Sequence, residues 1–350
     1  MQMQWDKLNW PILDRLREGF LSGAAANGPY WKSLEDLAQY DLTYAERIGW
    51  KWDAVLRELK WRRWSPALLG NAEPLTLVDW GCGSGIAGRR VIEAFGVEHF
   101  RRLEVWDHSP LAREFAANAA RKAFPGLEVG EFDARAESDI DLLVVSHVIN
   151  ELSAANRAVL LALVRRARAT IWVEPGTRPV SRDLASIRDE LRQTLRIVAP
   201  CTHAAPCGLF APENAEHWCH YFADPPPSIY ADSDWVRFGQ RAGIDLRSLP
   251  YSFLVTQNPA YPFSDDAFGA SRILGRPEHF KGYADILNCD AEGVQPLQLQ
   301  KRVDPAFFKE LKRTSDVPIY RWTREGGRIV GIEKDRRLQD DGAPPSGRPA

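Results

Sequence analysis

The stretch Asp-Trp-Gly-Cys-Gly-Ser-Gly at residues 79–85 separates two segments of different periodicity. Residues 75–79 before it form a short apolar run of the kind found in buried strands, and residues 86–95 after it have the spacing of an amphipathic helix. Gly81, Gly83 and Gly85 carry no side chain, so a ligand can approach the backbone N–H groups at the start of that helix. The sequence therefore predicts a strand, a ligand-binding turn and a helix in succession.

The same alternation of short apolar runs and longer amphipathic runs continues along the chain. We predict strands at residues 103–107, 127–133, 141–146 and 170–174, with helices at 110–123, 155–168 and 182–196. Two further strands are expected at 196–199 and 251–256. Strands that alternate with helices form a parallel sheet covered on both faces. The predicted fold class is α/β, a doubly wound Rossmann-like sheet, in a domain that spans residues 71–256.

Three carboxylates follow predicted strands, namely Asp79, Asp107 and Asp133. The carboxyl ends of parallel strands meet at one edge of the sheet, and ligands bind there. The glycine spacing at residues 83–88 also fits a dinucleotide-binding turn. The glycines alone therefore leave three interpretations open: S-adenosylmethionine (SAM), a nicotinamide cofactor and a purely structural turn.

Asp79 favours SAM among these interpretations. A carboxylate placed before the glycines does nothing for a pyrophosphate but attracts an ammonium group, and SAM has an amino-acid tail and no pyrophosphate. Asp107 can then accept the ribose hydroxyls, and Asp133 can accept the adenine amino group. In these features residues 75–256 resemble class I methyltransferases. The resulting cofactor-binding set is Asp79, Gly81, Gly83, Gly85, Asp107 and Asp133.

The catalytic residues of a methyltransferase are not marked by a known tetrapeptide, because the Asn/Asp-Pro-Pro-aromatic motif of amino-group methyltransferases is absent from the end of the fourth strand. Ser-His-Val-Ile-Asn-Glu-Leu stands there at residues 146–152. Its His147 and Asn150 can orient a substrate or cap a helix. The turn Glu-Pro-Gly-Thr at 174–177 lies at the same rim and has both a functional and a turn-forming interpretation. Enzymatic activity of the SAM-dependent, rRNA-directed type stays open, with His147 and Asn150 as candidates.

Composition narrows the class of protein. The 45 Lys and Arg residues against 47 Asp and Glu give a net charge of −2, so a nucleic-acid partner must be bound by a local basic patch. No apolar run approaches the roughly 20 residues that cross a bilayer. The first residues lack the layout of a secretory or organelle-targeting segment. We expect a cytoplasmic protein that does not span a membrane, and its oligomeric state stays open.

Three of the five cysteines lie within nineteen residues, inside a segment at 200–245 that interrupts the alternation of strands and helices. Disulfides are not expected in a chain without signs of secretion, so Cys201, Cys207 and Cys219 indicate metal binding. Their spacing leaves three possibilities open: buried thiols without metal, zinc, and an iron–sulfur cluster. Three histidines accompany these cysteines: His203, His217 and His220.

Five motifs together resemble the methyltransferase-like small-ribosomal-subunit proteins of mitochondria and bacteria. They are Ser-His-Val-Ile-Asn-Glu-Leu (146–152), Val-Glu-Pro-Gly-Thr (173–177), Ala-Pro-Cys-Thr-His-Ala-Ala-Pro-Cys (199–207), Trp-Cys-His-Tyr-Phe (218–222) and Gly-Tyr-Ala-Asp-Ile-Leu-Asn-Cys (282–289). The resemblance covers about residues 75–302. This chain departs from the pattern after Cys207, where Gly-Leu-Phe and a longer loop precede Trp218.

The resemblance implies a metal cofactor and a partner. In that family the cysteines that match Cys201, Cys207, Cys219 and Cys289 hold a [4Fe-4S] cluster, which places the cluster ahead of zinc. The family acts in assembly of the small ribosomal subunit through contact with its rRNA. We therefore expect a SAM-binding, methyltransferase-like protein that binds small-subunit rRNA. The alternatives are a methyltransferase of a small molecule or protein with a structural zinc, and a non-catalytic RNA-binding assembly factor.

The two ends of the chain differ from the central domain. Residues 1–70 are predicted to form a helical lobe, and its seven tryptophans either fill a core or stack on bases. Residues 257–338 are predicted to form a β-rich basic extension, with hairpin strands at 283–289 and 294–300. Between 301 and 337, eleven Lys and Arg stand against six Asp and Glu. Aromatic residues interleave with these cations and favour RNA binding over an ordinary solvated surface: Phe307, Phe308, Tyr320 and Trp322. Residues 339–350 are expected to be disordered.

Overall fold

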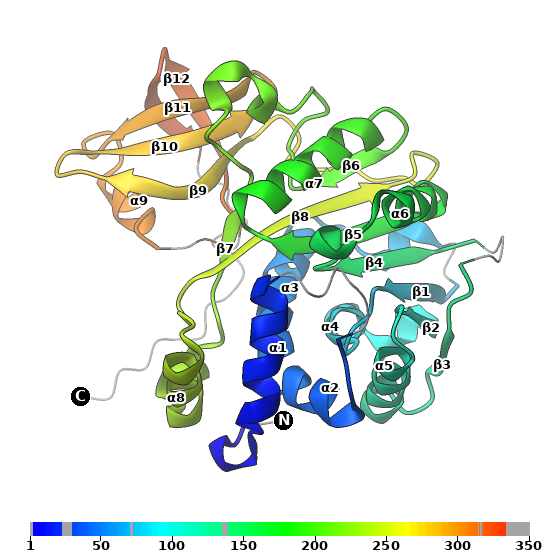
Figure 1. Cartoon of the computed structure of the whole chain (residues 1–350). Coiled ribbons are helices and arrows are strands. Elements are labelled where there is room, and N and C mark those ends of the chain that lie inside the picture. The colour runs from blue at the N-terminus through cyan, green and yellow to red at the C-terminus, as the bar shows by residue number, and fades with distance from the viewer. Residues whose placement is uncertain are drawn as a thin grey trace.

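The computed structural model describes residues 3–22, 30–70, 73–134, 139–313, 315 and 317–333. At its centre these residues form a mixed sheet of eight strands in the order β3-β2-β1-β4-β5-β8-β6, with β7 paired to β8 (Figure 1). The strands are β1 (Leu75–Trp80), β2 (Phe100–Trp106), β3 (Glu128–Glu131), β4 (Leu142–Ser146), β5 (Ala169–Pro175), β6 (Arg196–Ala199), β7 (Tyr221–Ala223) and β8 (Leu249–Gln257).

The direction of the strands confirms the predicted fold class and corrects one detail. β3, β2, β1, β4 and β5 are parallel neighbours, but β8 runs antiparallel between β5 and β6. The prediction of an all-parallel sheet was therefore wrong at this edge. β8 comes later in the chain than β6, after β7, and pairs directly with β6. An antiparallel pair of this kind needs no right-handed crossover. The result is an α/β fold whose mixed sheet has one reversed strand beside the edge strand.

Two layers of helices cover the sheet. α3 (Tyr44–Trp61), α4 (Ile86–Phe95) and α5 (Pro110–Ala123) share a core with Leu75 and Leu77 of β1. α6 (Ala154–Arg166) and α7 (Arg178–Leu191) share a second core with Val78 and Trp80. Successive residues of a strand point to opposite faces, so a strand buried on both faces is a nearly continuous apolar run. α7 begins before the predicted residue 182 because Pro179 fits the first turn of a helix.

The N-terminal lobe consists of α1 (Trp10–Ser22), α2 (Leu34–Asp41) and α3. Its tryptophans fill a core, since Trp50, Trp52 and Trp64 are buried. α8 (Ser233–Ala242), which belongs to the segment predicted as an insertion, packs against this lobe. The ring of Trp235 lies 4.9 Å from that of Trp50 between centroids. Of the two interpretations of the tryptophans, core filling is confirmed for these three.

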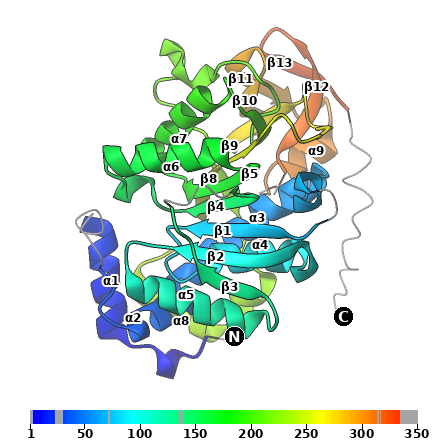
Figure 2. The same cartoon turned by 90° about the vertical axis from the view of Figure 1, so that its right-hand side faces the viewer.

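The C-terminal part forms a closed five-stranded barrel with the circuit β9-β10-β11-β13-β12-β9. Its elements are β9 (Ser271–His279), β10 (Tyr283–Asp290), β11 (Gly293–Gln300), α9 (Pro305–Glu310), β12 (Ile319–Glu325) and β13 (Arg328–Glu333). Figures 1 and 2 show the barrel at one end of the molecule and α1, α2 and α8 at the other. The predicted hairpin of two strands around an Asp-Ala-Glu-Gly turn is confirmed as β10 and β11.

The predicted use of the C-terminal aromatic residues was wrong. Phe308 is buried against the ring of His279, and Trp322 is partly buried against the barrel core. Phe307 and Tyr320 are buried within that core, and their rings are in contact at 4.9 Å between centroids. A small barrel must fill its interior with large apolar side chains, and these residues do so. They are therefore not free to stack on bases. The predicted disordered tail at 339–350 lies outside the described residues. Within those residues, no helix has both the length and the apolar character needed to cross a membrane.

Candidate functional site

The glycine turn between β1 and α4 has the backbone shape that its sequence requires. Gly81, Gly83 and Gly85 have φ values of 71°, 51° and 76°, a region that L side chains rarely adopt. A Cβ atom on Gly81 would stand 2.6 Å from Cγ1 of Val148, whereas a Cβ on Gly83 would meet no atom within 4 Å. The turn is thus packed on one side and open at Gly83, where a ligand can reach the backbone.

Asp79 lies beneath this turn and is fully buried. Its Oδ2 accepts a hydrogen bond from the Gly88 N–H at 3.0 Å, while its Oδ1 has no hydrogen-bond partner among the described residues. Burial raises the pKa of Asp79 to about 7. A Cβ on Gly88 would stand 2.8 Å from Oδ2. Gly88 therefore lets α4 pack on Asp79, which explains the glycine spacing at 83–88 without a dinucleotide.

Asp107 directly follows β2 and lies beside the turn. Its Oδ2 accepts from the Gly83 N–H at 3.0 Å and its Oδ1 from the Ser109 N–H at 2.9 Å, so the carboxylate is held in one orientation. Each carboxylate oxygen can accept a further hydrogen bond. Asp133 is exposed beyond β3, and of the three carboxylates only Asp107 is among the residues that line the cavity above the turn. Of the three predicted carboxylates, the structure brings Asp79 and Asp107 together at the turn and leaves Asp133 apart.

A cavity of about 680 Å³ opens above the glycine turn, and we call it the cofactor cavity. Its volume lies within the range of small-molecule sites, about 300–1,000 Å³. One wall comes from the ends of β1 and β2, where the rings of Trp80 and Trp106 are stacked 4.7 Å apart. The opposite wall comes from the N-terminal lobe and is mostly aromatic: Phe20, Tyr30, Trp31, Tyr40 and Tyr44.

Both predicted catalytic candidates line this cavity, together with a lysine that the sequence did not single out. His147 has a φ of 57°, and its Nε2 lies 3.3 Å from Nζ of Lys51. Burial lowers the pKa of Lys51 to about 7 and that of His147 well below its ordinary value. Asn150 is exposed, and Ser153 rather than either candidate caps α6. Lys51 belongs to α3, far away in sequence, and no local pattern marks it.

Glu174 gives the turn at 174–177 a role beyond reversing the chain. Its Oε1 accepts from the N–H groups of Val148 at 3.0 Å and Ile149 at 3.2 Å, and from Nε1 of Trp172 at 2.6 Å. Burial raises the pKa of Glu174 to about 7. The carboxyl group therefore positions the segment that carries His147 and Asn150.

The four predicted metal ligands lie around a second cavity of about 40 Å³, which we call the cysteine cavity. Cys201, Cys207 and Cys219 come from the segment between β6 and β7, and Cys289 comes from β10 of the barrel. The Cys289 Sγ also lies 3.8 Å from Nε2 of His203. Within the part of the chain that is described, no group of three or more His, Cys, Asp or Glu side chains is arranged to hold a metal ion. The structure thus gathers the four thiols but shows no single-ion site.

The cysteine cavity combines neutral thiols with buried cations. Burial raises the pKa of Cys207 to about 11 and that of Cys219 to about 12. Arg188 and Arg272 line the same cavity and are buried. Both guanidinium groups are ion-paired, Arg188 with Asp189 at 2.7 Å and Arg272 with Glu58 at 2.6 Å, so neither leaves an unbalanced charge in the cavity.

Arg272 also joins the barrel to the rest of the molecule. Its Nη1 and Nη2 donate to the two carboxylate oxygens of Glu58 on α3, at 2.7 and 2.6 Å. Arg62 donates to the same carboxylate at 2.9 Å, and both arginines donate to the carbonyl oxygen of Pro200. Although burial opposes it, the two guanidinium groups hold the pKa of Glu58 below its ordinary value. Pro200, the residue before Cys201, is therefore held in place by a fully buried ionic network.

Comparison with known proteins gives one family and several distant structures. The family model described as mitochondrial small ribosomal subunit Rsm22 matches residues 43–314, more than half of the chain. No curated protein matches. Magnesium protoporphyrin IX methyltransferase (ChlM) from Synechocystis PCC 6803, solved with bound SAH, is 14% identical with a TM-score of 0.38, covering 73% of this chain and 97% of that one. A SAM-dependent methyltransferase from Aquifex aeolicus is 15% identical with a TM-score of 0.35, and the match covers 49% of this chain and 93% of that one.

Proposed function

This chain belongs to the mitochondrial small ribosomal subunit Rsm22 family, and we propose that it binds SAM and acts on the small ribosomal subunit through its rRNA. The family match supports the partner. The observation that carries the cofactor is the open glycine turn, with Asp107 fixed beside it and Asp79 buried beneath it. Such a turn at the carboxyl end of a central strand is the place where open α/β sheets bind nucleotide-like ligands.

The residues of the turn would each meet a different part of SAM. The backbone at Gly83 would contact the cofactor where no Cβ intervenes, and Asp107 would accept hydrogen bonds from the ribose hydroxyls. Asp79 would balance the ammonium group of the amino-acid tail, since one of its oxygens has no hydrogen-bond partner among the described residues. An ammonium group nearby favours the ionised carboxylate. Contact of Asp133 with the adenine stays a prediction.

A methyl-transfer reaction would take place in the part of the cofactor cavity between the glycine turn and the N-terminal lobe. His147 and Asn150 line that space and would orient a substrate, with Lys51 within hydrogen-bond distance of His147. At neutral pH both the His147 ring and a fraction of the Lys51 amine are uncharged, as a proton acceptor must be. rRNA methylation is therefore part of the proposal.

We further propose a [4Fe-4S] cluster as a second cofactor, held by Cys201, Cys207, Cys219 and Cys289, as the resemblance of the cysteine motifs implies. Four thiolates on one zinc ion lie about 3.8 Å apart, given Zn–S bonds of about 2.3 Å in a tetrahedron. A cubane cluster spaces its thiolates more widely, because each binds its own iron. The four thiols line one cavity, but within the described residues no group of three or more His, Cys, Asp or Glu side chains is arranged to hold a metal ion, so the cluster is proposed from the resemblance of the motifs and from the shared cavity. A cluster bound there would tie the segment between β6 and β7 to the barrel.

The experiment that tests this function uses the full chain purified without oxygen. Calorimetry with SAM should give binding at one site, and radiolabelled SAM should label small ribosomal subunits more than a cell extract that lacks them. Iron and acid-labile sulfide should be present in equal amounts, with broad absorption near about 400 nm. Absence of SAM binding overturns the cofactor, and stoichiometric zinc without iron overturns the cluster. Bound SAM without transfer to subunits leaves a non-catalytic assembly factor.

A further inference from the structure

The barrel has the connectivity of a five-stranded oligonucleotide-binding barrel. Its first three strands are consecutive neighbours, its third and fifth strands (β11 and β13) are parallel, and α9 lies between the third and fourth. In such barrels, ligands bind on the second and third strands and the loops after the first and fourth. Here these are β10, β11 and the loops at 280–282 and 326–327. The likeness of fold only indicates where a ligand would lie.

The two loops flank the last residues of β11. The Lys301 N–H donates to the carbonyl oxygen of Gly282 at 2.9 Å, and the Gln298 N–H donates to that of Gly327 at 2.8 Å. The chain continues from Lys301 into α9, whose Phe308 ring is stacked on His279 at 5.2 Å. The loop after β9, the end of β11 and the helix therefore form one continuous surface.

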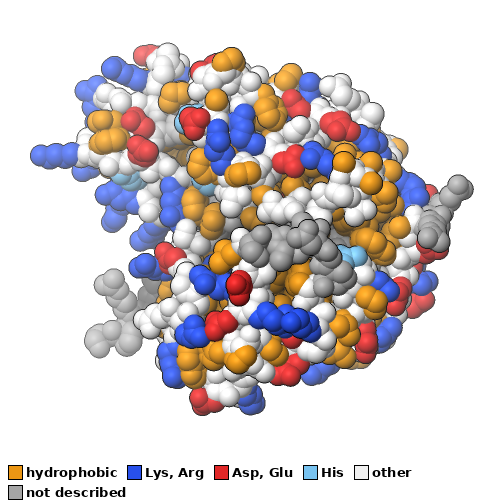
Figure 3. Space-filling model, viewed as in Figure 1, with side chains coloured by type: hydrophobic (Ala, Val, Ile, Leu, Met, Phe, Trp, Pro, Cys, Tyr) orange, Lys and Arg blue, Asp and Glu red, His pale blue; other side chains and the backbone are white. Residues whose placement is uncertain are grey.

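This surface carries most of the exposed cations of the barrel. We define the basic barrel end as the exposed cations Lys281, Lys301, Arg302, Lys309, Lys312 and Arg313 with the rings of Phe280 and Tyr283. Among the residues that the structure places, none of these six cations forms an ion pair, and Lys and Arg side chains gather over the barrel at the upper left of Figure 3. The acidic residues on the same elements are Glu278, Asp285, Asp304 and Glu310.

Two other cations of the barrel are already engaged. Arg324 pairs with Asp290 at 3.2 Å and with Glu292 at 2.9 Å. Arg321 donates to the carbonyl oxygens of Asp266 and Phe268. Of the remaining exposed cations, Arg276 lies over the ring of Phe222 at 3.8 Å, and Arg328 directly follows the loop at 326–327. Among the described residues of the barrel, most of the exposed cations without an ion pair are thus at one end, where a polyanion would neutralise them.

An aromatic surface lies at the same place. The rings of Phe280 and Tyr283 are stacked 4.6 Å apart with an angle of 16° between their planes, and 43% of Phe280 is exposed. The Phe280 N–H donates to the carbonyl oxygen of Tyr283 at 2.9 Å, which holds the pair in place across the loop. A large exposed ring beside unpaired cations is the combination that binds single-stranded nucleic acids.

We propose that the basic barrel end binds single-stranded RNA, with an unpaired base stacked on Phe280 and phosphates contacted by Lys281, Lys301 and Arg302. This assignment rests on the proposed action on small-subunit rRNA and specifies its binding surface. It revises the surface expected from sequence, because Phe307 and Tyr320 are in the barrel core, Phe308 is buried against His279, and Arg321 is bound to backbone carbonyls.

The test compares charge-reversed variants in filter binding to a single-stranded RNA of about twelve nucleotides and to purified small-subunit rRNA. The barrel variant is Lys281→Glu, Lys301→Glu and Arg302→Glu. If three phosphate contacts are lost, the slope of log affinity against log salt should flatten by about 2, at about 0.7 per contact. Phe280→Ala should weaken binding about 5- to 150-fold and Phe280→Tyr should retain it, since stacking on one base contributes about 1–3 kcal/mol.

The matched control reverses three exposed lysines elsewhere, Lys7→Glu, Lys32→Glu and Lys122→Glu, and should leave the slope unchanged. SAM affinity and circular dichroism should match the parent in every variant, which shows that each is folded. If the parent binds RNA and the barrel variant binds equally well, the surface is wrong while the proposed function stands. If the parent binds neither RNA, both fail. A barrel variant that loses intact subunits but keeps naked rRNA identifies a protein partner and overturns the RNA assignment.

Discussion

The cofactor cavity and the cysteine cavity both border the central sheet but are assembled in different ways. The floor of the cofactor cavity comes from one continuous stretch, residues 79–88, together with Asp107 at the end of the neighbouring strand. The cysteine cavity takes its thiols from positions 201 to 289 and its buried ionic network from Glu58 on α3. A local turn can form its shape from its own backbone, whereas the cysteine cavity exists only when the barrel, α3 and the β6–β7 segment are all in place.

The two cavities also differ in the charged groups that line them. The turn holds the buried carboxyl group of Asp79, and the cofactor cavity is lined by Asp107 and by Glu151, whose pKa burial raises to about 7. The cysteine cavity holds two buried guanidinium groups beside thiols. SAM carries an ammonium and a sulfonium group, while a [4Fe-4S] cluster with four thiolates is an anion. Since Arg47 and Lys51 also line the cofactor cavity and both arginines of the cysteine cavity are ion-paired, the two proposed ligands rest on the glycine turn and on the four thiols rather than on the charge of the lining.

The largest effect is expected from Glu58→Gln, which breaks the buried network beside the cysteine cavity. Arg272 and Arg62 would lose their shared carboxylate while remaining buried, and removal of one partner of a buried pair costs about 3–5 kcal/mol. Chemical denaturation should show this loss in the free energy of unfolding. Iron content should fall in the same variant, whereas SAM affinity should stay close to that of the parent, because the glycine turn does not depend on Glu58.

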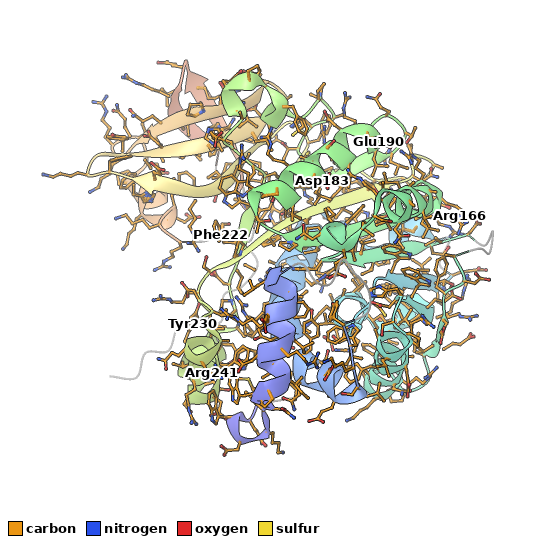
Figure 4. All side chains as sticks on the ribbon, viewed as in Figure 1. Arg166, Asp183, Glu190, Phe222, Tyr230 and Arg241 are labelled. Atoms are coloured by element: carbon orange, nitrogen blue, oxygen red, sulfur yellow. The ribbon has the colours of Figure 1, made fainter. Side chains whose placement is uncertain are left out.

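The matched control for this variant is Glu190→Gln. Glu190 pairs with Arg165 at the surface of α7 (Figure 4), and an exposed pair contributes about 0–1 kcal/mol. If Glu58→Gln is no less stable than this control, the barrel and α3 are not coupled through the network. If it loses SAM affinity and iron equally, the contrast between the two cavities is wrong.

An intermediate effect is expected from Asp107→Ala at the cofactor cavity. The ribose hydroxyls would lose a charged acceptor, and hydrogen bonds to charged groups contribute about 1.5–3 kcal/mol, or about a 10- to 150-fold loss of SAM affinity. Calorimetry measures the loss, and iron content should not change. The control is Asp183→Ala on the outer side of α7 (Figure 4), where Asp183 pairs with Arg157. Equal affinities in the two variants would place the cofactor elsewhere.

The smallest effect concerns pH. Burial raises the pKa of Asp79 to about 7, so a proton on this group stabilises the free folded protein at low pH, and that stabilisation is lost as pH rises through about 7. An ammonium ligand needs the ionised form. SAM affinity should therefore be about five- to tenfold weaker at pH 6 than at pH 7.5, because less than about a tenth of Asp79 is ionised at pH 6.

Titration of SAM binding between pH 6 and 7.5 checks this expectation, with Asp79→Asn as the comparison. The variant has no carboxyl group to ionise, so its affinity should vary less with pH than that of the parent. The same slope in both proteins would show that another group causes the pH dependence, and Glu151 would be the first candidate.

How much of the site could be predicted differs between residues. The order of strands and helices and the placement of Gly81, Gly83 and Asp107 followed from periodicity and from glycine, because a turn and its flanking hydrogen bonds involve neighbouring residues. Lys51 could not be predicted, since it reaches His147 only through the packing of α3 against the sheet. Gly88 belonged to an ambiguous pattern until its contact with Asp79 explained it.

The aromatic residues show why composition alone misled the prediction of the RNA surface. Phe307, Phe308 and Tyr320 interleave with cations in the sequence, yet Phe307 and Tyr320 are in the core of a closed barrel and Phe308 is buried against His279. Phe280 and Tyr283 have fewer cations next to them in sequence. The pairing of β10 with β11 brings them to the end of β11, which Lys301 and Arg302 follow. Whether an aromatic ring is inside or outside depends on which strands close the barrel, and neighbouring residues do not determine that.

Sequence alone determined the α/β class, the glycine turn and the presence of an unusual cysteine-rich segment, because each depends on backbone preferences or residue chemistry within a few positions. The tertiary structure decided which cysteines share a cavity, which carboxylate faces the cofactor cavity and which cations are left unpaired. Those properties depend on burial and on distances between segments that are far apart in sequence, such as Glu58 and Arg272 with a separation of 214 residues. Packing free energy, which is summed over the whole chain, sets these distances.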